Sequence, residues 1–103
     1  MQTWMLPLCQ LYAAKIIQSI RLYAPKYSRL IALAPEQEIN LREILLICAK
    51  NFSDKQKFVQ FCKRLTNKIL SLTLLVKFKA GNAFSFRMEF EDNNKIRFTI
   101  KDM

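Results

Sequence analysis

Histidine is absent from this chain of 103 residues, and its absence excludes several kinds of chemistry. Histidine is the commonest general base and the commonest metal ligand in proteins. Without it, serine or cysteine catalysis through a histidine partner is excluded. Three cysteines alone also complete neither common structural zinc site, which takes four thiolates or two thiolates and two imidazoles. We therefore expect no bound metal.

Glycine is almost as scarce. The one glycine, Gly81, lies between two stretches of alternating hydrophobicity, a position typical of a hairpin turn. A single glycine cannot build a Gly-rich phosphate-binding loop, so we expect no cofactor. Hydrophobic residues make up 51% of the chain, which is enough for one core. We expect residues 1–103 to form a single domain, helical over about 1–70 and β-stranded over about 72–101.

The three cysteines lack the spacing of a metal or redox motif. Cys9, Cys48 and Cys62 each lie among apolar residues in a helical pattern. An odd number of cysteines without a C-x-x-C pair indicates buried, reduced thiols, although a disulfide between two of them stays open. Reduced thiols are typical of an intracellular, reducing compartment, so we expect the cytoplasm or the nucleus.

Acidic residues are also few, with 8 Asp and Glu against 17 Lys and Arg, a net charge of +9. Glu36 is the first acidic residue, and four cations precede it: Lys15, Arg21, Lys26 and Arg29. Acid-free amphipathic starts occur in mitochondrial transit peptides, so mitochondrial import is an alternative. The stretch holds little serine, however, and its apolar face is wide enough to be core. No run of 18 uncharged apolar residues exists, so we expect no membrane span.

Three stretches repeat apolar residues at spacings of three and four, which predicts three helices. The first covers about 8–24 and ends before Pro25, which disfavours helix at the preceding residue. The second covers about 39–51, and segment 28–33 before it fits either a short strand or a helical turn. The third follows Ser53, whose side chain fits a capping box with Gln56.

From Leu72 onward the period changes from 3.6 to 2, and eleven even-numbered positions are apolar. This alternation predicts three antiparallel strands with one buried face and one solvated face. A turn at Gly81 would pair Phe78 with Phe84, and a turn at Asn93 would pair Phe90 with Ile96. The predicted fold class is α+β, with three N-terminal helices packed on one face of a C-terminal three-stranded antiparallel β-meander. Its element order is similar to that of a winged helix.

The cations concentrate on the third predicted helix and the strands that follow it. Lys and Arg bind phosphates, and Gln, Asn and Arg read base edges. We therefore expect a small, non-enzymatic nucleic-acid-binding module. Its candidate binding residues are Lys55, Lys57, Gln60, Lys63, Arg64, Asn67, Lys68, Lys77, Lys79 and Arg87. The positive charge suits DNA, RNA or an acidic protein surface and does not choose among them.

Two alternatives remain. The first two predicted helices carry more apolar surface than one small sheet can cover, which predicts an interaction subunit or adaptor, either a homodimer or part of a larger complex. The candidate interface residues are Leu11, Leu22, Leu46 and Ile47. In size, charge and element order the chain is also similar to ribonuclease toxins of the RelE/ParE kind, which can work with Lys, Arg and Tyr. No motif of that family is present.

Overall fold

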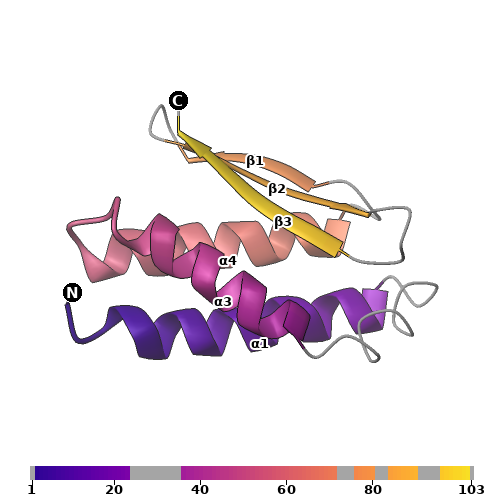
Figure 1. Cartoon of the computed structure of the whole chain (residues 1–103), viewed down its shortest axis with the longest axis horizontal. Coiled ribbons are helices and arrows are strands. Elements are labelled where there is room, and N and C mark those ends of the chain that lie inside the picture. Colours follow the sequence, from indigo (N-terminus) through magenta and orange to yellow (C-terminus); the bar gives the residue numbers. More distant parts are fainter. Residues whose placement is uncertain (1, 24–35, 72–75, 81–83, 91–95, 103) are drawn as a thin grey trace.

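A computed structural model describes residues 2–23, 36–71, 76–80, 84–90 and 96–102. The described helices and strands, labelled as in Figure 1, are α1 (Met5–Tyr23), α3 (Glu36–Ala49), α4 (Lys55–Ser71), β1 (Val76–Ala80), β2 (Phe84–Phe90) and β3 (Ile96–Asp102). The predicted segment 28–33 lies outside the described residues.

The elements lie in three layers (Figure 1). Helix α1 packs against both α3 and α4, whereas β3 packs on α3 and β1 packs on α4. The strands follow the order β1-β2-β3, with both pairs antiparallel. Helices α3 and α4 therefore separate α1 from the sheet, and α1 forms the outer layer.

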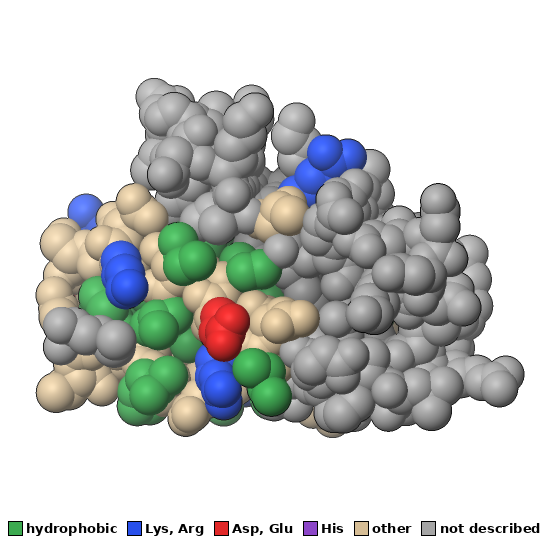
Figure 2. Space-filling view, viewed as in Figure 1, with side chains coloured by type: hydrophobic (Ala, Val, Ile, Leu, Met, Phe, Trp, Pro, Cys, Tyr) green, Lys and Arg blue, Asp and Glu red, His purple; other side chains and the backbone are tan. Residues whose placement is uncertain are grey.

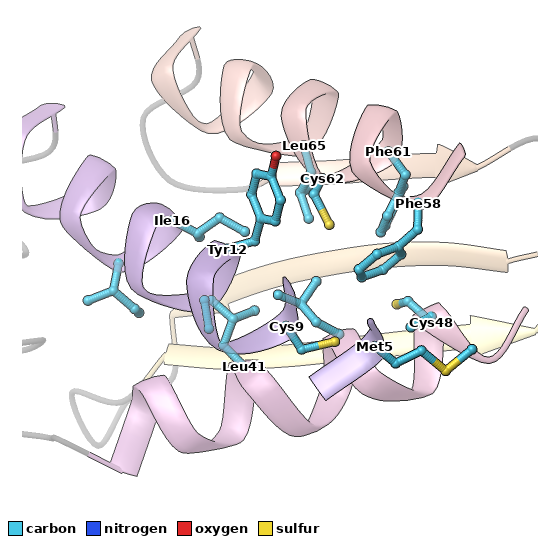
Figure 3. Close-up of a cluster of buried hydrophobic side chains, with 14 of the residues drawn as sticks. Met5, Cys9, Tyr12, Ile16, Leu41, Cys48, Phe58, Phe61, Cys62 and Leu65 are labelled. Atoms are coloured by element: carbon cyan, nitrogen blue, oxygen red, sulfur yellow. The ribbon is translucent and has the colours of Figure 1, made fainter. Parts of the chain in front are cut away.

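The core is formed by the three helices. Every side chain that is described as buried belongs to one of them, and the largest fully buried ones are Phe58, Ile16, Ile20, Leu41, Leu45 and Leu65. Figure 3 shows side chains from all three helices converging on one cluster. The stripes predicted from the apolar spacing are confirmed at these six positions, because apolar residues three and four apart share one helix face.

The predicted fold class is wrong for the described part of the chain. The helices do not lie side by side on one face of a sheet, because their apolar faces are buried against one another in a helical bundle. The described side chains give a helical core, and the similarity to a winged helix is lost with the predicted arrangement. The physical reason is that α1 buries Cys9, Ala13, Ile16 and Ile20 against α3 and α4 instead of against strands.

The two strand pairings differ in how they compare with the expected register. In the first, Phe78 pairs with Phe86 and Ala80 pairs with Phe84. The partner of Phe78 is therefore two residues further along β2 than the expected Phe84. In the second, Phe90 pairs with Ile96, as expected. The shift preserves the parity of the pairing, so the same residues share each face. The alternation also predicts that Phe86 is buried, and this prediction falls on a side chain outside those described.

Candidate nucleic-acid interface

The first turn of α4 is held by Asp54. The backbone N–H of Gln56 donates to Asp54 Oδ1 at 2.8 Å, and the N–H of Phe58 donates to the Asp54 carbonyl at 3.2 Å. Asp54 is therefore the N-cap, and the predicted capping box at Ser53 is wrong by one residue. A carboxylate suits this position because it accepts from an unpaired N–H and carries charge that the positive end of the helix dipole favours.

The buried stripe of α4 sets which of its residues face outward. Phe58, Phe61, Cys62 and Leu65 are buried, and Phe58 packs against Trp4 and Phe52 at ring-centroid distances of 5.6 Å. At about 100° per residue, the remaining positions gather on the opposite side of the helix. The side chains exposed there are Gln56, Lys57, Gln60, Lys63, Arg64 and Asn67. We call this set the α4 polar face.

The α4 polar face contains three cations, Lys57, Lys63 and Arg64, and no acidic residue. From Lys57 to Asn67 the helix rises about 15 Å. The three amides of the face lie between and beside the cations, so charged and neutral donors alternate along it. Lys55 is also exposed, in the first turn. The sequence thus predicted the exposed side of α4 correctly, because the apolar stripe opposite it is unambiguous.

The other predicted binding residues lie beyond this face. Lys68 belongs to α4, but its side chain is not among those described. Lys77 and Lys79 are in β1, the strand that packs on α4, and Lys77 is paired with Arg87 of β2. Arg87 is exposed. Two cationic positions therefore stand directly opposite each other in the ladder.

The predicted interface residues divide into two groups. Leu11 is 47% exposed, Leu22 is 64% exposed and Ile47 is 48% exposed, whereas Leu46 is half-buried against the core. Two exposed residues were missed, Leu6 at the start of α1 and Ile39 in α3. Figure 2 shows apolar side chains at the surface over the helices, among Lys, Arg and acidic side chains.

The three thiols lie in the apolar core, where burial disfavours the charged thiolate. Cys9, Cys48 and Cys62 form no disulfide and are fully buried, one on each helix (Figure 3). Burial raises the pKa of Cys9 to about 11. Burial also raises the pKa of Cys62, as do Cys9 and Cys48 to a smaller extent. Among the residues that the structure describes, no three Cys, Asp or Glu side chains are grouped to hold a metal ion.

Comparison with known proteins gives this site no precedent. The chain matches no family model, no curated protein and no solved structure. Within the described ranges, no helix has the length and apolar character needed to cross a membrane. The case for a function therefore depends on the chemistry of the exposed side chains.

Proposed function

We propose that the protein binds nucleic acid through the α4 polar face, without catalysing a reaction. The observation that carries the proposal is that Lys57, Lys63 and Arg64 share one exposed helix face with amide side chains and with no carboxylate. An acid-free cationic face attracts phosphates from a distance and repels other cationic surfaces. The net charge of +9 adds to that attraction over the whole molecule.

Binding begins with electrostatic capture. Each Lys or Arg that neutralises a phosphate releases condensed counterions, which drives association and makes the affinity fall with salt. Once α4 lies along the backbone, Gln60, Asn67 and Arg64 supply donors and acceptors for base edges. The major groove of B-form DNA is wide enough for an α-helix, whereas the deep, narrow major groove of double-stranded RNA is not. The proposed ligand is therefore duplex DNA.

The strands extend the cationic surface. Because β1 packs on α4, the cationic positions Lys77 and Lys79 belong to the strand next to the binding helix, and Arg87 of β2 is paired with Lys77. These residues therefore contact the DNA backbone and position α4, and they carry no sequence information.

The test is fluorescence anisotropy with a labelled DNA duplex at about 50 and 200 mM salt. The double variant Lys57→Gln/Lys63→Gln should reduce the slope of log affinity against log salt by about 2. The matched control is Lys15→Gln/Lys50→Gln, which removes the same charge from exposed positions outside α4 and should leave the slope nearly unchanged. No binding at the lower salt, or equal effects of the two double variants, would refute the proposal.

Parallel titrations separate the possible ligands. A duplex of RNA and a single strand of the same sequence are measured beside the DNA duplex. We expect the DNA duplex to bind most tightly because only its major groove admits a helix. Preference for the RNA duplex would mean that α4 does not enter a groove, and the docking of α4 would be refuted while cationic capture remained.

A second candidate function is that of a protein–protein interaction subunit. The observation that favours it is the exposure of large apolar side chains on two helices, Leu11 and Leu22 of α1 and Ile47 of α3. Exposed apolar side chains that gather on one surface mark an interface with another protein. This function uses α1 and α3, so it is compatible with nucleic-acid binding by α4.

A further inference from the structure

The amides and the cations of the α4 polar face alternate along the helix axis but separate around its circumference. At about 100° per residue, Gln56, Asn67 and Gln60 fall within an arc of about 40°. Around the helix, the members of the face follow in the order Lys63, Gln56, Asn67, Gln60, Arg64 and Lys57. The three amides are therefore consecutive, with one cation on one side of them and two cations on the other.

This line of amides is the part of α4 that points most directly away from the core. Asn67 lies about 180° around the helix from the fully buried Phe58, and Gln56 lies about 180° from the fully buried Leu65. When α4 lies in a groove with its outermost line at the floor, the amides come to the base edges. The cations beside them then come to the walls of the groove, which the phosphates form.

The three amides are also available to a ligand. Other polar side chains of the helices bond to their own backbone. The Thr66 hydroxyl donates to the Cys62 carbonyl at 2.8 Å, and the Ser19 hydroxyl donates to the Lys15 carbonyl at 2.9 Å. Within the part of the chain that the structure describes, the three side-chain amides of the α4 polar face make no bond of this kind. Their donors and acceptors are exposed to solvent.

We propose that Gln56, Gln60 and Asn67 recognise adenines in the major groove of duplex DNA. Lys63 on one side of them and Lys57 on the other contact the phosphates of the two strands. The inference rests on the proposed function, because it names the bases that the same helix reads.

The chemistry of the two kinds of side chain supports this division. A carboxamide has an acceptor oxygen and a donor NH₂ group, which match the N6 donor and the N7 acceptor of adenine. The major-groove edge of guanine offers two acceptors, so the amide oxygen finds no donor there. A lysine ammonium group has donors only, which suits a phosphate. The amides therefore specify the sequence, and the lysines position the helix.

The length of the amide line sets the size of the site. From Gln56 to Asn67 the helix rises about 16 Å. At about 3.4 Å for each base pair, this length corresponds to about five base pairs. The expected ligand is a duplex with two or three adenines within a segment of that size.

The test uses the full chain and a pool of DNA duplexes with a randomised central segment, from which the bound duplexes are sequenced. For the wild type, we expect adenine to be favoured over guanine by about 5- to 150-fold at two or three positions. Gln60→Arg should change the preference at one of these positions from adenine to guanine, because a guanidinium group donates to both acceptors of guanine. Arginine is a good helix former, and circular dichroism checks that α4 is preserved.

Two further variants separate sequence recognition from charge. Gln18→Arg adds the same charge at an exposed glutamine of α1 and should leave every base preference unchanged. Lys57→Ala should weaken binding to all sequences by a similar factor without changing the selected bases.

The outcomes distinguish this inference from the proposed function. A wild-type chain that binds the pool without selecting adenine would overturn the role of the amides and leave the cationic capture in place. So would a Gln60→Arg chain that keeps adenine at every selected position, or a Lys57→Ala chain with altered base preferences. If the wild type retains no duplex from the pool at about 50 mM salt, the proposed function itself is refuted.

Discussion

Helices α1 and α4 bury similar stripes and expose opposite chemistry. Each packs an apolar stripe into the same core, with Ile16 and Ile20 from α1 and Phe58 and Leu65 from α4. On the outside, α4 presents Lys57, Lys63 and Arg64, whereas α1 presents the apolar side chains of Leu11 and Leu22 beside a single described cation, Lys15. The two helices thus share one core and differ in what they offer a partner.

This difference shows which residues carry which information. The buried stripes determine how the bundle packs, and any well-fitting apolar residues would serve there. The exposed faces contribute little to that packing, so their composition is free to suit a partner. A cationic face suits a polyanion, and exposed apolar side chains suit another protein. The predictions below test whether the core is shared and the faces are independent.

The largest expected effect is on the shared core. Phe58 is fully buried and its ring packs against Trp4, Phe52 and Phe61. Phe58→Ala should lower the free energy of unfolding by about 3–5 kcal/mol, because a large cavity opens among the three helices. Urea unfolding followed by circular dichroism measures it. A loss below about 1 kcal/mol would show that α4 is not packed as described, and that α1 and α4 do not share one core.

Alkaline pH should weaken the same core from both helices at once. The folded chain holds the thiol proton of Cys9 more tightly than the unfolded chain, because burial raises its pKa from the ordinary 9.0 to about 11. The pKa of Cys62 is raised in the same direction. The contribution is complete below pH 9 and is lost as the pH rises through about 11, so stability should fall over that range.

Thermal melts of the wild type and of Cys9→Ala between pH 8 and pH 11 separate this effect from the titration of other groups. All remaining titratable residues are common to both chains, so the difference in slope belongs to Cys9 together with its smaller effect on the pKa of Cys62. The variant should lose stability less steeply over the range about 9 to 11. Equal slopes would mean that Cys9 does not titrate differently in the folded and unfolded chains.

The sequence predicted the helices better than their arrangement. Apolar residues at a spacing of three and four identify the helix face that is buried. Ile16 on α1 and Phe58 on α4 belong to such faces, and their predicted burial is confirmed. The same spacing does not say which element covers the face, because a helix and a sheet both present apolar surface. The predicted layering failed at α1 for this reason.

Two smaller errors have a similar origin. The expected Phe78–Phe84 pairing and the observed Phe78–Phe86 pairing keep the same residues on each face, so alternation cannot choose between them. At the start of α4, Ser53 and Asp54 are both good N-caps, and only the hydrogen bond of Asp54 decides.

A moderate effect is expected at the N-cap, where α4 differs from α1. Asp54 accepts a hydrogen bond from the Gln56 N–H, so Asp54→Ala should destabilise the protein by about 1 kcal/mol through fraying of the first turn. Ser53→Ala is the matched control and should change stability by less than about 0.5 kcal/mol. If urea unfolding showed that Ser53→Ala destabilises the protein more than Asp54→Ala, the N-cap would be Ser53, as the sequence predicted.

The smallest effect on folding is expected on the exposed face of α1. Leu22 is 64% exposed, so Leu22→Gln should change the free energy of unfolding of the monomer by less than about 0.5 kcal/mol. Leu45→Ala, at a fully buried position of α3, should cost about 2–5 kcal/mol. Urea unfolding at a protein concentration too low for self-association measures the effects of both substitutions. If Leu22→Gln cost as much as Leu45→Ala, the outer face of α1 would belong to the core. The proposed difference between the exposed faces of α1 and α4 would then be wrong.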